Sequence, residues 1–360
     1  MAARSDTNDA PVMHMASVPE AIEWQARHAE NGGAPGTARV IRALLPVLDS
    51  ETAVGRRMTN WQGLTLEDAM PLRIHGGLHN LLVTGEDRRL EEVYAGRLTR
   101  QAAVDELVCE LVQTYDTRLL PWLDGPPQTN EAGRSASIMA GLLWLAERVP
   151  ARFEMLELGA SAGVNTMMDR YRYDLGGVTV GPAKSPVLIA PEWRGNPPPA
   201  VDVEIASIRG CDVAPVDLTD PEAAMRLKSY VWPEMTARMG RIDAAIAMAT
   251  ERAPNVERMS GEDWVERELA RPSQTGVTRV LFHSIVWQYL PPEGRERITR
   301  AVAQAATRAT AGGPLAWLTL ETNRRTFAHE LRVRYWPGGA EDVLLAQSNP
   351  HGVWVDWFGE

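Results

Sequence analysis

The sequence predicts an α/β protein in which an all-helical N-terminal domain precedes a mainly parallel β-sheet with an antiparallel C-terminal edge. Apolar residues follow helical spacing up to about Pro150. From Phe153 onward, short apolar runs alternate with helix-like segments, as in parallel sheets whose strands are joined by helices. The last apolar runs are separated by turn residues alone, which is typical of antiparallel strands.

The composition limits the classes of partner. The chain has 360 residues, of which 44% are hydrophobic and 23% charged, an ordinary globular balance. A formal charge of -10 predicts no nucleic-acid and no membrane partner, because phosphate backbones and anionic lipids would repel the chain. Cys109 and Cys211 are too few and too far apart for a thiolate metal site or a disulfide framework. With no secretory signal in residues 1–19, we expect a soluble, cytoplasmic protein that acts on a small-molecule substrate.

Three segments make up the expected organisation. Residues 1–18 are small and polar and predict a disordered tail. Residues 19–150 predict a helical cap domain, with clear helical spacing over 104–115 and 138–149. This domain could act as a cap, a substrate lid or an oligomer surface, which leaves a homodimer open. Residues 151–360 predict a Rossmann-like domain interrupted by a Pro/Gly-rich excursion over about 176–200.

Within the second domain, each expected element follows from its apolar pattern. Helices are predicted over 164–173, 235–249 and 293–310. Strands are predicted over 153–158, 203–212, 278–287 and 315–320, with a short one beginning at 255. Further strands at 331–336, 342–347 and 352–357 would form the antiparallel edge.

The turn Gly159-Ala-Ser-Ala-Gly163 after the first strand supports two interpretations. As a ligand cradle, its glycines allow close backbone approach at the switch point of a doubly wound sheet. As a G-x-S-x-G elbow, it would present Ser161 as the nucleophile of a serine hydrolase, with His75-Gly76-Gly77 imitating an oxyanion motif. A hydrolase of that kind normally has several strands before the elbow, and here that region is helical. A non-catalytic binding or scaffold protein is the third alternative.

Glu157, Gly159 and Gly163 form E-x-G-x-x-x-G, which resembles the first motif of class I S-adenosylmethionine-dependent methyltransferases. Ser161 stands where a middle glycine is common, and a strict dinucleotide G-x-G-x-x-G is absent, which disfavours NAD and FAD. The resemblance implies S-adenosylmethionine as cofactor. It also implies that Asp212, ending the next strand, takes the ribose hydroxyls and that Asp263 lies near the adenine. The predicted cofactor-binding set is Glu157, Gly159, Ser161, Gly163, Asn165, Asp212, Asp263 and Ser284.

The remaining candidates lie near expected strand ends or helix starts. His283 lies toward the carboxyl end of the fourth strand and could orient an acceptor or take its proton. The predicted catalytic set is His283, Glu131 and Tyr289, and the predicted substrate-binding set is Asn130, Arg134, His79 and Glu321. His75 and His79 are spaced for a metal on one helix face, but no third ligand is in register, so no metal is predicted.

Four stretches together resemble the bacterial domain-of-unknown-function 2332 family over nearly the whole chain. This family implies a class I methyltransferase-like fold and no settled activity, because fold alone does not fix function. The stretches are 71–80, 128–134, 156–165 with 169–171, and 209–217 with 230–234.

Overall fold

The computed structural model describes residues 15–64 and 68–360, and the chain forms two compact units. The helical unit contains residues 15–129 and Thr219–Asp243, and the sheet unit contains Asn130–Leu218 and Ala244–Glu360. The boundary between these two units falls between Thr129 and Asn130. Most of the expected tail lies outside the described residues. Its last part begins the first helix, α1 (Val18–Asn31), where the side chain of Ser17 accepts a hydrogen bond from the Glu20 amide.

The helical unit packs around one central helix, α4 (Met70–Val83), which is buried along most of its length. A helix that is apolar on nearly every side is enclosed by its neighbours. The expected helix over 104–115 is α6 (Gln101–Thr114). The other elements of this unit are α2 (Pro35–Arg42), η1 (Pro46–Asp49), α3 (Ala53–Thr59), α5 (Glu91–Tyr94), α7 (Asp116–Leu119), η2 (Leu120–Asp124) and α9 (Pro221–Ser229). The first residues of α10 (Thr236–Glu251) complete it.

Polar side chains of α4 bind α9, which comes from a distant part of the sequence. His79 Nδ1 lies 2.9 Å from the Ser229 carbonyl oxygen, and Asn80 Nδ2 donates to Ser229 Oγ at 2.9 Å. Gly76 leaves room for Tyr230, which follows Ser229, since a Cβ at residue 76 would lie 2.6 Å from the Tyr230 ring. The His-Gly-Gly sequence of α4 is thus explained by close packing inside a helix.

The sheet unit is built on a nine-stranded sheet in the order β5-β12-β11-β10-β9-β8-β1-β6-β7. From β7 to β9 the strands are parallel, and β10, β11 and β12 pair antiparallel. The predicted fold class, a mainly parallel sheet with an antiparallel C-terminal edge after a helical region, is confirmed. The strands are β1 (Arg152–Leu158), β5 (Glu192–Arg194), β6 (Glu204–Asp212), β7 (Val256–Arg258), β8 (Thr278–Ser284), β9 (Leu315–Thr322), β10 (His329–Trp336), β11 (Gly339–Ser348) and β12 (Trp354–Trp357).

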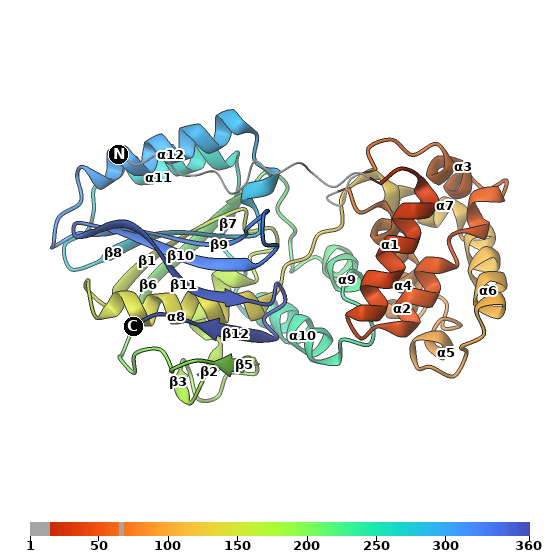
Figure 1. Cartoon of the computed structure of the whole chain (residues 1–360), viewed down its shortest axis with the longest axis horizontal. Helices are drawn as coiled ribbons and strands as arrows, with labels where there is room; N and C mark the ends of the chain where they lie inside the picture. Colours follow the sequence, from red (N-terminus) through yellow and green to blue (C-terminus); the bar gives the residue numbers. More distant parts are fainter. Residues whose placement is uncertain (1–14, 65–67) are drawn as a thin grey trace. The chain divides into compact units, whose positions relative to one another are not determined.

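Helices cover both faces of this sheet (Figure 1). The helices α11 (Gly261–Ala270) and α12 (Pro292–Ala306) pack on one face, around Leu156, Leu281 and Trp317. On the other face lies α8 (Ser135–Ala146), where a Cβ at Gly141 would touch Leu318. The short 3-10 helix η3 (Ala132–Arg134) leads into α8, and another, η5 (Trp287–Tyr289), follows β8.

The helix expected over 164–173 is not formed. A 3-10 helix, η4 (Asn165–Arg170), is followed directly by the strand β2 (Arg172–Leu175). Tyr171, Tyr173 and Leu175 are buried while their neighbours are more exposed, so the apolar period here is two rather than 3.6. The Pro/Gly-rich excursion supplies β3 (Val178–Val180) and β4 (Leu188–Ile189), which form a three-stranded sheet with β2.

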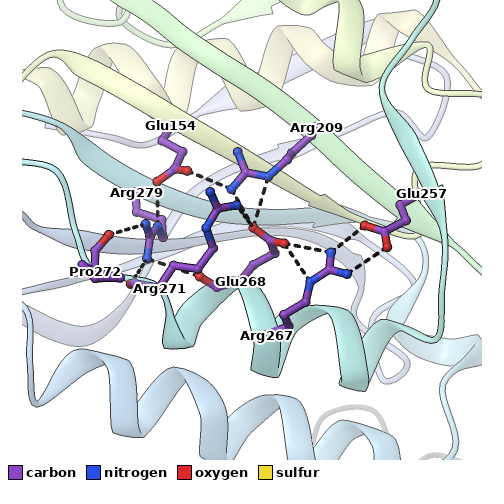
Figure 2. A network of polar contacts seen from close by, with 8 residues as sticks. All are labelled: Glu154, Arg209, Glu257, Arg267, Glu268, Arg271, Pro272 and Arg279. Atoms are coloured by element: carbon purple, nitrogen blue, oxygen red, sulfur yellow. Dashed lines mark hydrogen bonds and ion pairs between the residues drawn. The ribbon is translucent and has the colours of Figure 1, made fainter.

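A charged network lies between α11 and the strands β1, β6 and β8 (Figure 2). Glu268 of α11 is 3% exposed and accepts hydrogen bonds from Arg209, Arg267 and Arg271. Glu154 of β1 joins Arg209 to Arg279, which also donates to backbone carbonyl oxygens at the end of α11. Each buried charge therefore meets an opposite charge, which buried ions require.

Among residues 15–64 and 68–360, no helix is long and apolar enough to cross a membrane. Within the same part of the chain, His, Cys, Asp and Glu side chains form no group of three or more placed to hold a metal ion.

Candidate functional site at the carboxyl edge of the sheet

The strand order reverses direction between β1 and β8, at the centre of the sheet. The chain leaves β1 for β6 on one side, while β8 and β9 are added on the other. In open α/β sheets such a switch point leaves a crevice beyond the carboxyl ends of the two strands, and ligands bind there. The residues that follow β1 and β8 are therefore candidates for a ligand-binding site.

The turn after β1 has a backbone that only small residues tolerate well. Gly159 and Gly163 have φ of 70° and 74°, and Ser161 has φ of 52°. A Cβ at Gly159 would lie 2.2 Å from a methyl carbon of Val286, so this turn touches the loop after β8. A left-handed serine stores backbone strain, which is more common at functional sites than elsewhere.

Glu157 and Asn165 form a buried polar pair beside this turn. Their side chains are 1% and 2% exposed, and Asn165 Nδ2 donates to Glu157 Oε1 at 3.4 Å. Glu157 Oε2 and Asn165 Oδ1 have no hydrogen-bond partner among the described residues. Two buried oxygens without hydrogen-bond partners are costly and need an explanation, such as a ligand that donates to both when the Glu157 carboxyl is ionised.

Burial raises the pKa of Glu157 to about 8, and the nearby charge of Asp212 acts in the same direction. The Asn165 amide and the Arg134 guanidinium oppose this shift without cancelling it. Near neutral pH the carboxyl group is therefore largely protonated. A cation that came to rest beside Glu157 would lower its pKa and ionise it.

The segment before α8 lies against the same cluster. Asn130 Oδ1 accepts a hydrogen bond from the Val164 amide at 2.8 Å, and Glu131 Oε1 accepts one from the Gly133 amide at 3.0 Å. Arg134 donates to the carbonyl oxygen of Ser284, the last residue of β8, at 3.4 Å. The bonds of Asn130 and Arg134 place this segment beside the ends of β1 and β8, whereas the bond of Glu131 is local to the segment.

Asp212, at the end of β6, supports the turn after β1. Its Oδ2 accepts a hydrogen bond from the Ser161 amide at 2.9 Å, and its Oδ1 accepts one from the Ala214 amide at 2.9 Å. An ionised carboxylate has about four lone-pair positions, so these two bonds leave acceptor capacity for a ligand hydroxyl.

His283 and Glu321 face the other side of the sheet. Glu157 pairs in register with Phe282, so the side chain of the next residue, His283, points toward α11 and α12. His283 is fully buried, its Nδ1 lies 2.6 Å from Glu321 Oε1, and its ring stacks on Trp287 at 5.1 Å. The structure thus joins His283 to Glu321 and separates both from the Glu157 cluster.

Ser161 has no base within reach. Its Oγ is buried without a hydrogen-bond partner in the described part of the chain, so no imidazole lies within hydrogen-bond distance. No strand precedes β1 among residues 15–64 and 68–151. Both observations disfavour a nucleophile elbow, which needs a base beside the serine and several strands before it.

The surroundings of three other predicted residues are different. Asp263 is in the first turn of α11, where its carboxylate forms an ion pair with Arg297 of α12 at 2.7 Å. Tyr289, at the end of η5, is 60% exposed. His79 belongs to the helical unit, where it holds Ser229.

The model of a protein family described as "Uncharacterized protein conserved in bacteria (DUF2332)" matches residues 19–357. The chain belongs to the DUF2332 family. No curated protein and no solved structure matches the chain.

The stretches that carry the DUF2332 resemblance separate into two places in the structure. Stretches 156–165 and 209–217, with residues 130–134, meet at the carboxyl edge of the sheet. Stretches 71–80 and 230–234 meet inside the helical unit. The first group surrounds buried polar atoms that lack partners, and the second joins α4 to α9 and the residues after it.

Sequence reasoning did not identify Ile285 and Phe327. Both have a left-handed backbone, with φ of 53° and 59°, and both follow strands at the carboxyl edge. A β-branched or aromatic residue rarely adopts this conformation, so the residue type at these two positions does not predict it. The conformation of Ile285 is instead held from β9, where Leu320 accepts the hydrogen bond of the Ile285 amide at 2.9 Å.

Proposed function

We propose that the sheet unit binds S-adenosylmethionine at the carboxyl ends of β1 and β8, and that the protein is a methyltransferase for a small-molecule acceptor. The observation that carries this proposal is the pair of buried oxygens, Glu157 Oε2 and Asn165 Oδ1, that lack donors among the described residues. They lie beside the switch point of the sheet, the place where open α/β sheets bind ligands.

The chemistry of these groups selects the ligand. Two acceptor oxygens suit a group with several N–H donors and repel phosphate, so the α-ammonium of an amino acid fits better than the pyrophosphate of NAD or FAD. The short η4 also offers no long helix N-terminus to a phosphate. S-adenosylmethionine carries this ammonium together with ribose hydroxyls, for which Asp212 has acceptor capacity.

Each residue of the cluster has a task in this proposal. Glu157 and Asn165 hold the ammonium, and Asp212 binds the ribose while it supports the turn at Ser161. Gly159 and Gly163 allow the turn its shape. The bound cofactor supplies an electrophilic methyl group. Catalysis then depends mainly on alignment of two reactants, which needs no dedicated triad.

Calorimetric titration with S-adenosylhomocysteine tests this function. Wild-type protein should bind it, and Glu157→Gln should weaken binding about 10- to 100-fold, as expected for a lost charge-assisted hydrogen bond. Glutamine keeps the size of the side chain and its neutral state, because the free carboxyl is mostly protonated before binding. Glu204→Gln, at the exposed start of β6, is the matched control and should bind normally.

Binding should also release a proton near pH 7, because the cation ionises Glu157. Titrations in buffers of different ionisation enthalpy measure that release, and it should vanish in Glu157→Gln. Absence of heat and of a thermal shift with both cofactor forms would remove the proposal.

A further inference from the structure

Exposed apolar side chains collect at the same edge of the sheet as the Glu157 cluster. Val213, Tyr289, Phe327 and Val353 are exposed, and they follow β6, β8, β9 and β11. Those strands share a direction, so all four residues lie beyond their carboxyl ends. Of the four, Tyr289 and Phe327 follow adjacent strands, β8 and β9, and exposed apolar residues on neighbouring loops mark ligand or partner sites more often than scattered ones do.

Phe327 lies in the loop between β9 and β10, which is closed by hydrogen bonds to Asn323. The ring is 66% exposed, although its backbone is strained at φ of 59°. Asn323 fixes this shape. Its carbonyl accepts from the Phe327 amide at 2.7 Å, and its side-chain oxygen accepts from the Arg325 and Thr326 amides. The strained backbone and the exposed ring both cost free energy. A loop that holds them in one shape is preorganised for contact with a ligand.

Tyr289 belongs to the neighbouring loop, and Glu321 ties the two loops together. Glu321 accepts hydrogen bonds from the Val286 and Trp287 amides at 3.1 and 3.3 Å, and it lies two residues before Asn323. The two aromatic residues are thus carried on loops with a common anchor, beyond adjacent strands β8 and β9.

The charge of these loops is positive, in contrast to the chain as a whole. Residues 323–328 read Asn-Arg-Arg-Thr-Phe-Ala, and residues 285–292 contain no charged residue. The formal charge of the chain is -10, so a basic loop at this edge is a local exception. Arginine beside aromatic rings favours a planar, anionic ligand, because guanidinium pairs with carboxylate while the rings stack.

We infer that the loops after β8 and β9 bind the acceptor, and that the acceptor is a small aromatic compound bearing a carboxylate. Phe327 and Tyr289 contact its ring, and Arg325 pairs with its anionic group. The role of this compound as methyl acceptor rests on the proposed function. Its binding to the two loops does not, and it can be measured without the cofactor.

Ligand-observed NMR with 4-hydroxybenzoate and indole-3-acetate tests the inference on the full chain, with and without S-adenosylhomocysteine. Both acids should bind better than the neutral 4-hydroxybenzamide and the non-aromatic cyclohexanecarboxylate. Phe327→Ala should weaken binding of the aromatic acids about 10-fold, as loss of a stacking ring does. Arg325→Gln should remove the preference for the acid over the amide.

Phe358→Ala is the matched control, because Phe358 is also exposed but follows β12, away from these loops. It should leave all probe affinities unchanged. Binding of S-adenosylhomocysteine should be unaffected in Phe327→Ala and Arg325→Gln, so failure of the cofactor proposal and failure of this inference give different results. Probe binding that ignores both substitutions overturns the inference, as does failure of both aromatic acids to bind at millimolar concentration.

Discussion

His283 Nδ1 lies 2.6 Å from Glu321 Oε1, and this contact lies on the sheet face opposite to Glu157. Glu321 also accepts the amides of Val286 and Trp287. One carboxylate therefore holds a buried imidazole and the strained loop after β8. Glu321 and His283 therefore position this loop, and in the proposed function Glu157, on the other face, binds the ligand.

Glu321→Gln should destabilise the loop after β8. Glutamine keeps one acceptor oxygen but loses the charge that strengthens three hydrogen bonds, which predicts a loss of about 1.5–3 kcal/mol. Urea unfolding measures the loss, and hydrogen exchange of the Val286 and Trp287 amides should accelerate. Glu341→Gln, exposed on β11, is the control. Equal stability of the two variants would mean that Glu321 does not hold the loop.

Glu157→Gln should stabilise the ligand-free protein at alkaline pH. The folded pKa of about 8 exceeds the ordinary value of 4.5, so the folded state binds the extra proton between these values. Stability from this group is complete below about pH 4.5 and falls by about 1.4 kcal/mol per pH unit as pH rises toward 8. Urea unfolding at pH 5 and pH 8 should show this slope in the wild type and a smaller slope in the variant. If the stability of the wild type and of the variant changed equally with pH, Glu157 would be more exposed to solvent than its contacts indicate.

The parallel sheet could be predicted because its strands are apolar runs separated by clear turn signals. Glu157 and Asp212 could be placed at one edge for the same reason, since parallel strands end on the same side. The helix expected over 164–173 could not be corrected from sequence. Its residues fit both periods. In the structure the Tyr171 hydroxyl donates to the Val164 carbonyl, and the Tyr173 hydroxyl lies 3.0 Å from Ser135 Oγ, contacts that the residue pattern does not reveal.

The separation of His283 from Glu157 also lay beyond the sequence. It depends on the register of β1 against β8, where a slip of one residue would exchange the two faces. The position of α9 in the helical unit depends on contacts with α4, almost 150 residues away, and nothing near Ser229 in the sequence indicates them.

His79→Asn should make the stability of the helical unit depend less on pH between 6.5 and 4. Burial lowers the pKa of His79 to about 4, so the folded state excludes a proton that the unfolded chain binds below its ordinary value of 6.5. Stability from this histidine is present above pH 6.5 and is lost at about 1.4 kcal/mol per pH unit as pH falls toward 4. Asparagine can still donate to the Ser229 carbonyl but does not titrate. Hydrogen exchange of α4 and α9 amides between pH 6.5 and 5, corrected for intrinsic rates, measures the difference, and identical profiles would contradict it.

Glu268→Gln should be among the most damaging single changes in the sheet unit. Three guanidiniums, from Arg209, Arg267 and Arg271, meet on this carboxylate, and their hydrogen bonds hold its pKa at about 2 (Figure 2). Removal of the charge from the buried Glu268 leaves the half-buried Arg209 less compensated, which predicts a loss of about 3–5 kcal/mol in urea unfolding. The exposed pair Arg152–Glu204 provides the contrast, since Glu204→Gln should cost at most about 1 kcal/mol. The wild type should also lose this stabilisation only as pH falls from about 4.5 through 2, because a depressed carboxyl pKa protects the folded state above that window. Similar losses in the two variants would show that burial adds nothing to the strength of the network.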